Sequence, residues 1–144
     1  MYVSQIIAPI RYSHWISNLV STRKKTGETR RCVDFRNLNK VSLKDIYPLP
    51  KMDHILQSIV GASKISLLDG FSGYNQILVE PEDQAKIAFA TPWGTFMYLK
   101  MPFGLRNAGA TFQRAMDIAF AKEIHEFFMV YQDDIIVFSK SNNE

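Results

Sequence analysis

At 144 residues the chain is long enough for one domain with a substantial core, and 47% of its residues are hydrophobic, which indicates a folded globule. No run of about 18 apolar residues occurs and the N-terminus lacks the form of a signal peptide, so neither a membrane span nor a secretory leader is expected. The single cysteine, Cys32, excludes an internal disulfide framework, and the three histidines show no zinc-ligand spacing.

Basic residues are concentrated in one part of the chain. The formal net charge is +3, yet residues 23–51 hold nine basic side chains against three acidic ones. The basic residues are Arg23, Lys24, Lys25, Arg30, Arg31, Arg36, Lys40, Lys44 and Lys51. Such a run is commonly a solvated face, and it also suits a surface that meets the phosphates of a nucleotide or nucleic acid. Composition alone leaves both interpretations open.

The N-terminal third predicts a β-hairpin with a cationic tip. Residues 1–13 show little periodicity, and Pro9 discourages a long helix there. Residues 15–21 and 30–35 are expected to form two strands. The turn between them lies at residues 24–28, where Gly27 supplies a left-handed position.

An irregular segment and a helix follow. Residues 35–40 lead into an irregular stretch at 44–50, where two prolines favour an extended path. A helix is expected over residues 51–60, because apolar residues recur on one face at helical spacing. These residues are Met52, Ile55, Leu56 and Ile59. We expect this helix to serve packing and to end at Gly61.

The middle of the chain predicts short strands around a carboxylate. Residues 64–69 form an apolar strand that ends in Asp69, directly before Gly70. A carboxylate at a strand end is a common position for a metal ligand, and capping the next turn is an equally ordinary role. Further strands are expected at residues 76–79, 87–90 and 95–100, with a helical turn at 81–84.

The C-terminal third predicts a helix and a second hairpin. Residues 110–124 carry an apolar stripe at helical spacing, which is expected to face the core. Apolar runs on both sides of Asp133 and Asp134 indicate a hairpin over residues 127–138 with both carboxylates at its tip. Two adjacent aspartates between strands are usually only a turn. Because no cation lies at this turn, a divalent metal is the other explanation, and it requires a third ligand.

Six ordered motifs give the chain a specific resemblance. They are Cys32–Lys40 (CVDFRNLNK), Tyr47–Pro50 (YPLP), Leu68–Tyr74 (LDGFSGY), Met101–Leu105 (MPFGL), Ala110–Gln113 (ATFQ) and Tyr131–Asp134 (YQDD). In order and spacing they resemble the motifs of reverse transcriptases, and LDGFSGYNQI and PWGTFMY resemble gypsy-type LTR retrotransposons, especially plant ones. The resemblance covers about residues 15–139.

This resemblance implies an α+β fold: the fingers and palm of a reverse transcriptase, with a ferredoxin-like antiparallel palm sheet and packed helices. It places the fingers at about residues 1–60 and 81–110, and the palm at about residues 61–80 and 111–144. The fold is expected to be incomplete, with the thumb, connection and ribonuclease H in other parts of a parent polyprotein.

The resemblance also implies roles for individual residues. Asp69, Asp133 and Asp134 match the catalytic carboxylates, which would hold two Mg²⁺ ions, or Mn²⁺ in their place, during nucleotidyl transfer. Tyr74 matches an aromatic steric gate that disfavours the 2′-hydroxyl of an rNTP. The implied nucleotide-binding residues are Lys24, Arg30, Gly70, Tyr74, Phe103 and Gly104. The implied nucleic-acid-binding residues are Arg36, Asn39, Gln113, Tyr131 and Gln132.

The implied function is RNA-directed DNA polymerase, a nucleotidyltransferase. Its expected partners are an RNA or DNA template with its primer and a dNTP, without a membrane, and the family implies a cytoplasmic virus-like particle. Gln132 departs from the family pattern, because that position usually holds a smaller or apolar residue. Without primer-holding parts the chain is expected to polymerise poorly, since positioning supplies much of the rate. The alternatives are an inactive retroelement relic that at most binds nucleic acid through residues 23–51, and an RNA-dependent RNA polymerase palm, which Tyr74 disfavours.

Overall fold

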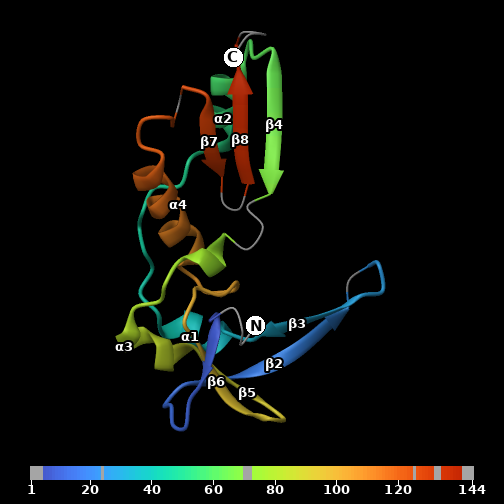
Figure 1. Cartoon of the computed structure of the whole chain (residues 1–144), viewed down its shortest axis with the longest axis vertical. Coiled ribbons are helices and arrows are strands. Elements are labelled where there is room, and N and C mark those ends of the chain that lie inside the picture. The colour runs from blue at the N-terminus through green and yellow to red at the C-terminus, as the bar shows by residue number, and fades with distance from the viewer. Residues whose placement is uncertain (1–4, 24, 70–72, 125, 132–133, 141–144) are drawn as a thin grey trace. The chain divides into compact units, whose positions relative to one another are not determined.

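The chain folds into two compact units, each built from two separate stretches of sequence (Figure 1). The computed structural model describes residues 5–23, 25–69, 73–124, 126–131 and 134–140, and only the backbone of Arg30 and Asp69. Unit 1 comprises Met1–Lys44 and Tyr74–Ala108, and unit 2 comprises Asp45–Gly73 and Gly109–Glu144. Each unit has its own sheet.

Unit 1 is organised around a five-stranded sheet in the order β1-β6-β5-β2-β3. The strands are β1 (Ile7–Pro9), β2 (Ile16–Arg23), β3 (Thr29–Val33), β5 (Ala88–Thr91) and β6 (Gly94–Tyr98). Neighbouring strands are antiparallel except β2 and β5, which pair in parallel with Ile16 opposite Ala88. A parallel pair cannot be closed by a tight turn, so this pairing requires the long stretch of chain between the two strands.

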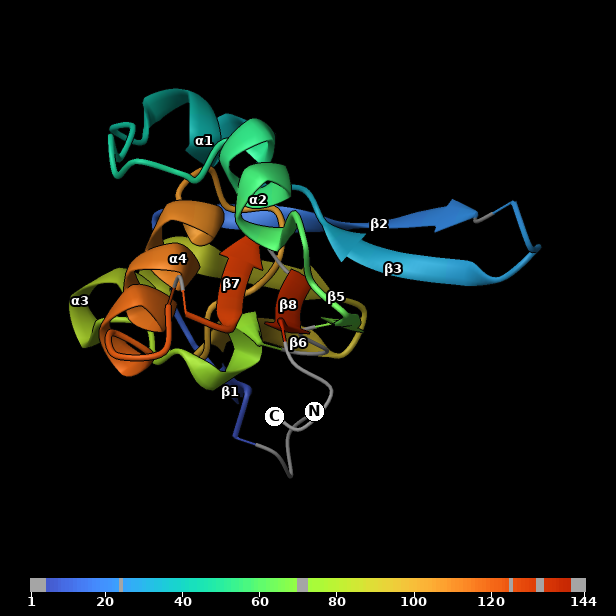
Figure 2. The ribbon, with the colours of Figure 1, turned by 90° about the horizontal axis from the view of Figure 1, so that it is seen from above.

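The β2–β3 hairpin extends beyond the other strands of its sheet (Figure 2). Only Ile16–Asn18 of β2 pairs with β5, so the rest of the hairpin is a two-stranded ribbon. Its turn contains Gly27 at φ +87°, a left-handed conformation that glycine adopts without steric cost. Arg23, Lys25 and Arg31 are exposed, so the ribbon presents basic side chains to solvent.

Aromatic residues fill the core of unit 1. The Phe89 ring lies 5.0 Å from that of Tyr98, and the Phe35 ring lies 6.3 Å from it. Phe35 and Phe89 are buried. The short helices of this unit are α1 (Arg36–Val41), η1 (Tyr74–Gln76), α3 (Pro81–Gln84) and η2 (Ala85–Ile87), of which η1 and η2 are 3₁₀ helices.

Unit 2 contains a three-stranded antiparallel sheet in the order β4-β8-β7. Its strands are β4 (Lys64–Asp69), β7 (Phe128–Tyr131) and β8 (Asp134–Ser139). Helix α2 (Met52–Ile59) packs its one buried residue, Ile55, against Met129, Ile136 and Phe138. Ile136 and Phe138 alternate along β8 and therefore share one face of the sheet. The predicted packing role of this helix follows from the contacts of Ile55.

Helix α4 (Ala108–Ala119) begins at the last residue of unit 1 and continues through unit 2. Beyond its end, the Phe120 ring lies 4.4 Å from that of Phe128 on β7. Among the described residues, no helix is long and apolar enough to cross a membrane.

Two expected elements are wrong in extent or type. Residues 76–79 were predicted as a strand, but they form one isolated bridge, between Leu78 and Lys100. The segment begins in the 3₁₀ helix η1, where the Ile77 N–H donates to the Tyr74 carbonyl at 3.1 Å, and its pairing is confined to the residues around Leu78. The helix predicted to reach residue 124 ends at Ala119, where Phe120 turns towards β7.

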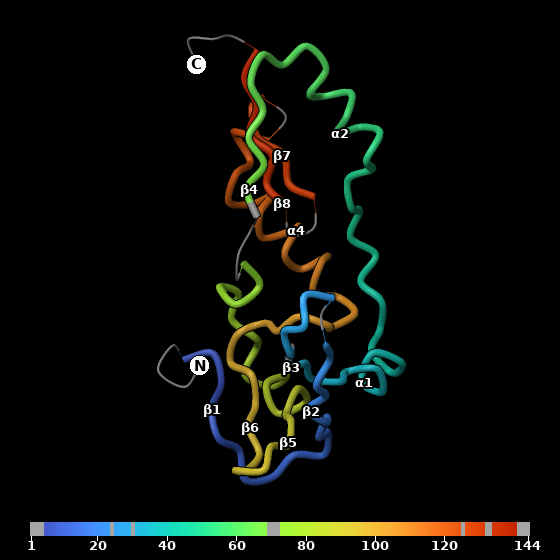
Figure 3. The backbone as a smooth tube through the Cα atoms, turned by 90° about the vertical axis from the view of Figure 1, so that its right-hand side faces the viewer, coloured from blue at the N-terminus to red at the C-terminus, as the bar shows by residue number. Residues whose placement is uncertain are grey.

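Two regular elements were not predicted from the sequence. Residues 7–9 form β1, whose three residues are too few to give a periodic pattern and are held by pairing with β6. Residues 36–41 form α1, whereas the chain between α1 and α2 is irregular as predicted, and Figure 3 traces it as an extended path. The remaining expected strands and helices are confirmed within a few residues.

Candidate active site

The strand register of unit 2 brings two of the predicted catalytic residues together. β4 ends at Asp69 and β8 begins at Asp134, and the antiparallel register sets these two residues directly opposite each other. The Cα atoms of such a pair lie about 4.5–5.5 Å apart. Asp134 is therefore the first residue of a paired strand, and its position next to Asp69 is fixed by six consecutive register pairs.

Asp134 is exposed, and no ion pair joins it to a basic residue in the part of the chain that the structure describes. An exposed carboxylate without a basic partner is a suitable ligand for a hard cation, which prefers oxygen ligands. Asp133 and the side chain of Asp69 lie outside the described residues, which themselves contain no cluster of three or more candidate metal ligands.

Tyr131 lies opposite Asp134 on the other side of β8, at the end of β7. It is half-buried and packs against the apolar cluster of Ile55, Met129, Ile136 and Phe138. The cluster therefore supports Tyr131, the neighbour of Asp134 on β7, and the strand β8 that Asp134 begins. Gln132, between the two strands, lies outside the described residues.

In unit 1, the two aromatic residues predicted to meet the nucleotide contact each other. Tyr74 is buried, Phe103 is 54% exposed, and their rings meet edge to face with centroids 4.9 Å apart. Gly104 follows at φ +91°, in the left-handed region that side chains rarely adopt. The pair offers one exposed aromatic ring supported by one buried ring.

Asn39 holds the loop that carries Phe103 and Gly104. Its Nδ2 donates to the Gly104 carbonyl at 2.8 Å, and its Oδ1 accepts from the Arg106 N–H at 2.8 Å. The Arg106 guanidinium also donates to the carbonyls of Asn39 and Ser42 at the end of α1. The Asn39 amide thus bonds to this loop through both its nitrogen and its oxygen. The predicted contact of Asn39 with nucleic acid stays a prediction.

Arg36 is exposed and bonds to Asp34 through two nitrogens. Its Nε donates to Oδ1 at 2.9 Å and its Nη2 to Oδ2 at 2.7 Å. These hydrogen bonds, together with one from the Arg36 backbone N–H, lower the pKa of Asp34 to about 2. Two nitrogens of the Arg36 guanidinium thus already donate to Asp34, and a phosphate contact would use the N–H donors that remain.

Three further predicted nucleotide contacts lie at the limits of the described chain. Lys24 and Gly70 lie outside it. Arg30 is described by its backbone, which pairs with Thr22 in the β2–β3 hairpin.

Gln113 belongs to a polar network in unit 2 that the sequence did not reveal. It is buried, and its Nε2 donates to Asp117 Oδ1 at 2.9 Å. Asp117 Oδ2 accepts from the Tyr47 hydroxyl at 2.6 Å, which together with burial raises the pKa of Tyr47. Arg114 pairs with Asp45 at 2.8 Å and lies over the Tyr47 ring. The only signal in the sequence was the pair of charges three residues apart on an otherwise apolar helix.

Comparisons with known proteins agree with these motifs. Residues 22–144 match the family model described as "Reverse transcriptase (RNA-dependent DNA polymerase)". The chain is 37% identical over 137 residues to the Pol polyprotein from transposon 297 of Drosophila melanogaster, covering 95% of this chain and 13% of that polyprotein. It is 43% identical over 119 residues to the Pol polyprotein from transposon opus of the same organism, and this match covers 81% of this chain and 12% of that polyprotein. The Tf2-3 polyprotein of Schizosaccharomyces pombe is 39% identical over 121 residues, covering 84% and 9%.

Solved structures support the fold. The native prototype foamy virus protease-reverse transcriptase matches with a TM-score of 0.79 at 22% identity, covering 94% of this chain and 18% of that chain. The foamy viral enzyme in complex with double-stranded DNA matches with a TM-score of 0.83 at 19% identity, covering 97% and 24%. The α+β arrangement is thus that of a reverse transcriptase fingers and palm. The chain spans about an eighth of the length of the curated relatives named first.

Proposed function

Because the chain belongs to the reverse transcriptase (RNA-dependent DNA polymerase) family, we propose that it carries the fingers and palm of an RNA-directed DNA polymerase from an LTR-retrotransposon polyprotein. We take unit 1 as the fingers and unit 2 as the palm. Relative to the bounds predicted from the sequence, this assignment moves residues 45–60 and 109–110 to the palm and residues 74–80 to the fingers.

One observation carries this proposal: Asp69 and Asp134 are register partners at the same end of the palm sheet. Two acidic residues on adjacent strands are unfavourable unless something positive shares them. With Asp133 as the neighbour of Asp134, the set consists of carboxylate oxygens, the ligands that Mg²⁺ prefers. Members of this family use divalent metal ions, and we propose two Mg²⁺ ions, with Mn²⁺ as a substitute, held by Asp69, Asp133 and Asp134.

The reaction is in-line displacement at the α-phosphate of a dNTP by the primer 3′-hydroxyl, with pyrophosphate as the leaving group. The divalent ions would neutralise the charge that develops on the attacking and leaving oxygens. The chain's own residues contribute by holding the proposed ligands in position. The register of β4 and β8 places Asp69 opposite Asp134, and packing of Tyr131 on the Ile55 cluster supports the strand beside them.

We propose that Tyr74 and Phe103 select the sugar of the incoming nucleotide. The buried Tyr74 ring is held edge-on by Phe103, so it can exclude a 2′-hydroxyl by its fixed volume. Lys24, Arg30 and Gly70 are the further proposed nucleotide contacts, and Gly104 completes the loop after Phe103.

We propose a primed RNA or DNA template as the macromolecular partner. The solved relatives include a complex with double-stranded DNA and one with an RNA/DNA hybrid. The exposed basic residues of the β2–β3 hairpin provide charge for phosphate contacts. Arg36, Asn39, Gln113, Tyr131 and Gln132 remain the proposed contacts to the nucleic acid.

Primer extension on poly(rA)/oligo(dT) with Mg²⁺ tests the proposal. We expect extension that EDTA abolishes, and that Asp134→Asn lowers by about 100-fold or more, because the substitution removes a metal-binding charge. Asp53→Asn is the matched control, because Asp53 is an exposed carboxylate in the first turn of α2. It should leave the rate unchanged.

Two results would contradict the proposal. Extension that Asp134→Asn leaves intact would mean that the activity does not use this site. Absence of extension alongside salt-sensitive binding of the primed template would instead identify a chain that binds nucleic acid without catalysis.

A further inference from the structure

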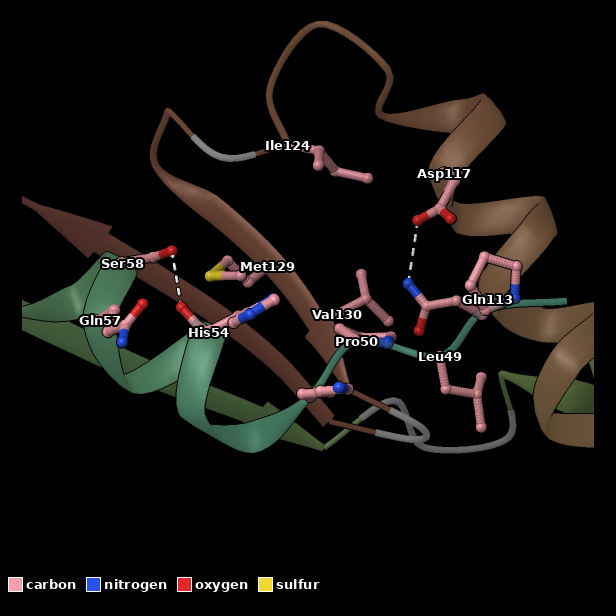
Figure 4. Close-up of a pocket in the computed structure, with 12 residues that line it drawn as sticks. Leu49, Pro50, His54, Gln57, Ser58, Gln113, Asp117, Ile124, Met129 and Val130 are labelled. Carbon is pink, nitrogen blue, oxygen red and sulfur yellow. Dashed lines mark hydrogen bonds between the residues drawn. The ribbon is translucent and has the colours of Figure 1, made fainter.

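Unit 2 contains a cavity of about 800 Å³ whose lining includes Gln113, a proposed nucleic-acid contact, but none of the proposed metal ligands or nucleotide contacts (Figure 4). Its walls come from the segment after Tyr47, from α2, from α4 and the loop after it, and from β7. The apolar lining consists of Pro48, Leu49, Pro50, Ile124, Met129 and Val130. The volume is within the range of small-molecule sites, which are largely apolar with a few placed polar groups.

The first of these polar groups is the amide of Gln113. Gln113 is 4% exposed, and its Nε2 donates to Asp117, which fixes which end of the amide is the oxygen. Figure 4 shows the Oε1 atom turned away from Asp117. Within the described part of the chain, Oε1 is buried without a hydrogen-bond partner. Buried carbonyl oxygens are normally paired, so this atom is an acceptor that lacks its donor.

The second polar group is the carboxylate of Asp117. It accepts from two uncharged donors, the Tyr47 hydroxyl at 2.6 Å and Gln113 Nε2 at 2.9 Å. The nearest candidate cation along the helix, Arg114, is engaged by Asp45 instead. In the residues that the structure describes, no ion pair neutralises Asp117.

We propose that this cavity binds a small planar aromatic molecule that carries a single positive charge on adjacent N–H donors, as an aryl amidine does. The ring would lie against the apolar lining, while the paired N–H donors would meet the Asp117 carboxylate. Paired N–H donors match a carboxylate in geometry and in charge. Lys51 also lines the cavity, so a second positive charge on the ligand would be repelled.

The test uses benzamidine as the probe and the methyl signals of Ile124, Met129 and Val130 in NMR spectra of the 144-residue chain. We expect saturable shifts of these signals with half-saturation at about 1 mM, the range that ligand efficiency sets for so small a molecule. Benzoate has the same size and the opposite charge, and it should shift them at least about tenfold less.

Two variants locate the contact. Asp117→Asn keeps the shape of the side chain but removes its charge, and it should weaken benzamidine binding about tenfold. Asp83→Asn removes an exposed carboxylate in unit 1 and is the matched control for net charge, with no change expected. If Asp117→Asn unfolds, Ile124→Phe serves in its place, because it fills the cavity from a half-buried loop position and should also weaken binding.

The proposal is overturned if benzamidine leaves these methyl signals unshifted at 10-fold above the expected half-saturation, about 10 mM. Equal shifts with benzoate, or full binding in the folded variants, would overturn it too. None of these readouts depends on polymerase activity.

Discussion

Some side chains in this molecule are held by short hydrogen bonds to charged partners, and these hydrogen bonds shift their pKa values. Asp34 is held by Arg36 through the side-chain hydrogen bonds and the backbone N–H, in that order of effect. The carboxylate form is therefore favoured in the folded chain. Tyr47 behaves in the opposite sense, since its hydrogen bond to Asp117 favours the neutral hydroxyl.

We predict that Asp34 titrates with a pKa of about 2 in the folded chain. A depressed carboxyl pKa means that the folded state is favoured above the ordinary value of about 4, and that this contribution is lost as the pH falls towards 2. NMR titration of the Asp34 carboxyl measures this directly. Arg36→Gln should return the pKa towards its ordinary value, whereas Arg31→Gln, an exposed control on β3, should not.

We predict that Tyr47 has a pKa above its ordinary value of 10. The stabilisation from this raised pKa is complete below about pH 10 and is lost as the pH rises through the folded-state value. Ultraviolet or NMR titration measures the pKa, and Asp117→Asn should lower it. Tyr98 is the internal control: burial raises its pKa, so the Asp117 substitution should leave Tyr98 unchanged.

At the scale of elements, α2 holds its sheet through very few residues. Ile55 is the residue of α2 that is fully buried, and its partners Met129, Ile136 and Phe138 lie on β7 and β8. The position of Asp134 at the start of β8 thus depends on one apolar contact cluster.

Ile55→Ala is predicted to lower the free energy of unfolding by about 3 kcal/mol, because it leaves a cavity in this cluster. Leu56→Ala is the matched control on the same helix, since Leu56 is 51% exposed, and it should cost less than about 0.5 kcal/mol. Denaturant titration followed through NMR signals of unit 2 gives both values. Equal losses in the two variants would show that the cluster is not what stabilises the helix.

The sequence predicted elements well where a pattern extends over several residues. The stripe of α2 and the apolar runs around Asp133 and Asp134 are of this kind, and the structure confirms both elements. β1 and α1 were missed because elements of three and six residues show too little periodicity to be recognised. Strand pairing or loop contacts determine whether such short elements form. The segment after Tyr74 was mistaken for a strand because its apolar residues resemble one, while a local hydrogen bond makes a 3₁₀ turn.

At the scale of the whole molecule, charge distribution matters more than net charge. The chain has 17 basic and 14 acidic residues, so its net charge of +3 predicts only weak attraction for nucleic acid. The exposed Arg23, Lys25 and Arg31 gather in the β2–β3 hairpin. Binding that depends on this placement is distinguishable from binding that depends on net charge.

We predict that binding of a primed template weakens with salt, and that replacing Arg23, Lys25 and Arg31 by Gln reduces the log–log salt slope by about 2–3, since each phosphate contact contributes about 0.9. Replacing three exposed lysines elsewhere removes the same net charge. Lys86, Lys122 and Lys140 are exposed and serve as this control, with little change expected in the slope. A matching fall in both triple variants would show that net charge alone governs binding.

For the site, the motifs predicted which residues matter but not how they are held. The pairing of Asp69 with Asp134 depends on a strand register across the intervening chain, which no local pattern encodes. The Asn39 link to Gly104 and the Asp117 network also join segments distant in sequence. Such contacts are tertiary, so a single sequence reveals the residue types and leaves the partners unknown.

The interleaving of the two units sets the order in which a nascent chain can fold. The ribosome releases β4 long before β8, its only partner among the described strands, and the apolar Ile65, Leu67 and Leu68 stay exposed even after pairing. Unit 1 can complete its sheet once β6 has emerged, whereas the partner of Asp69 emerges later, with β8. We therefore expect translation that stalls before residue 134 to leave β4 as an uncovered, aggregation-prone edge, and the acidic pair to assemble only after β8 has been synthesised.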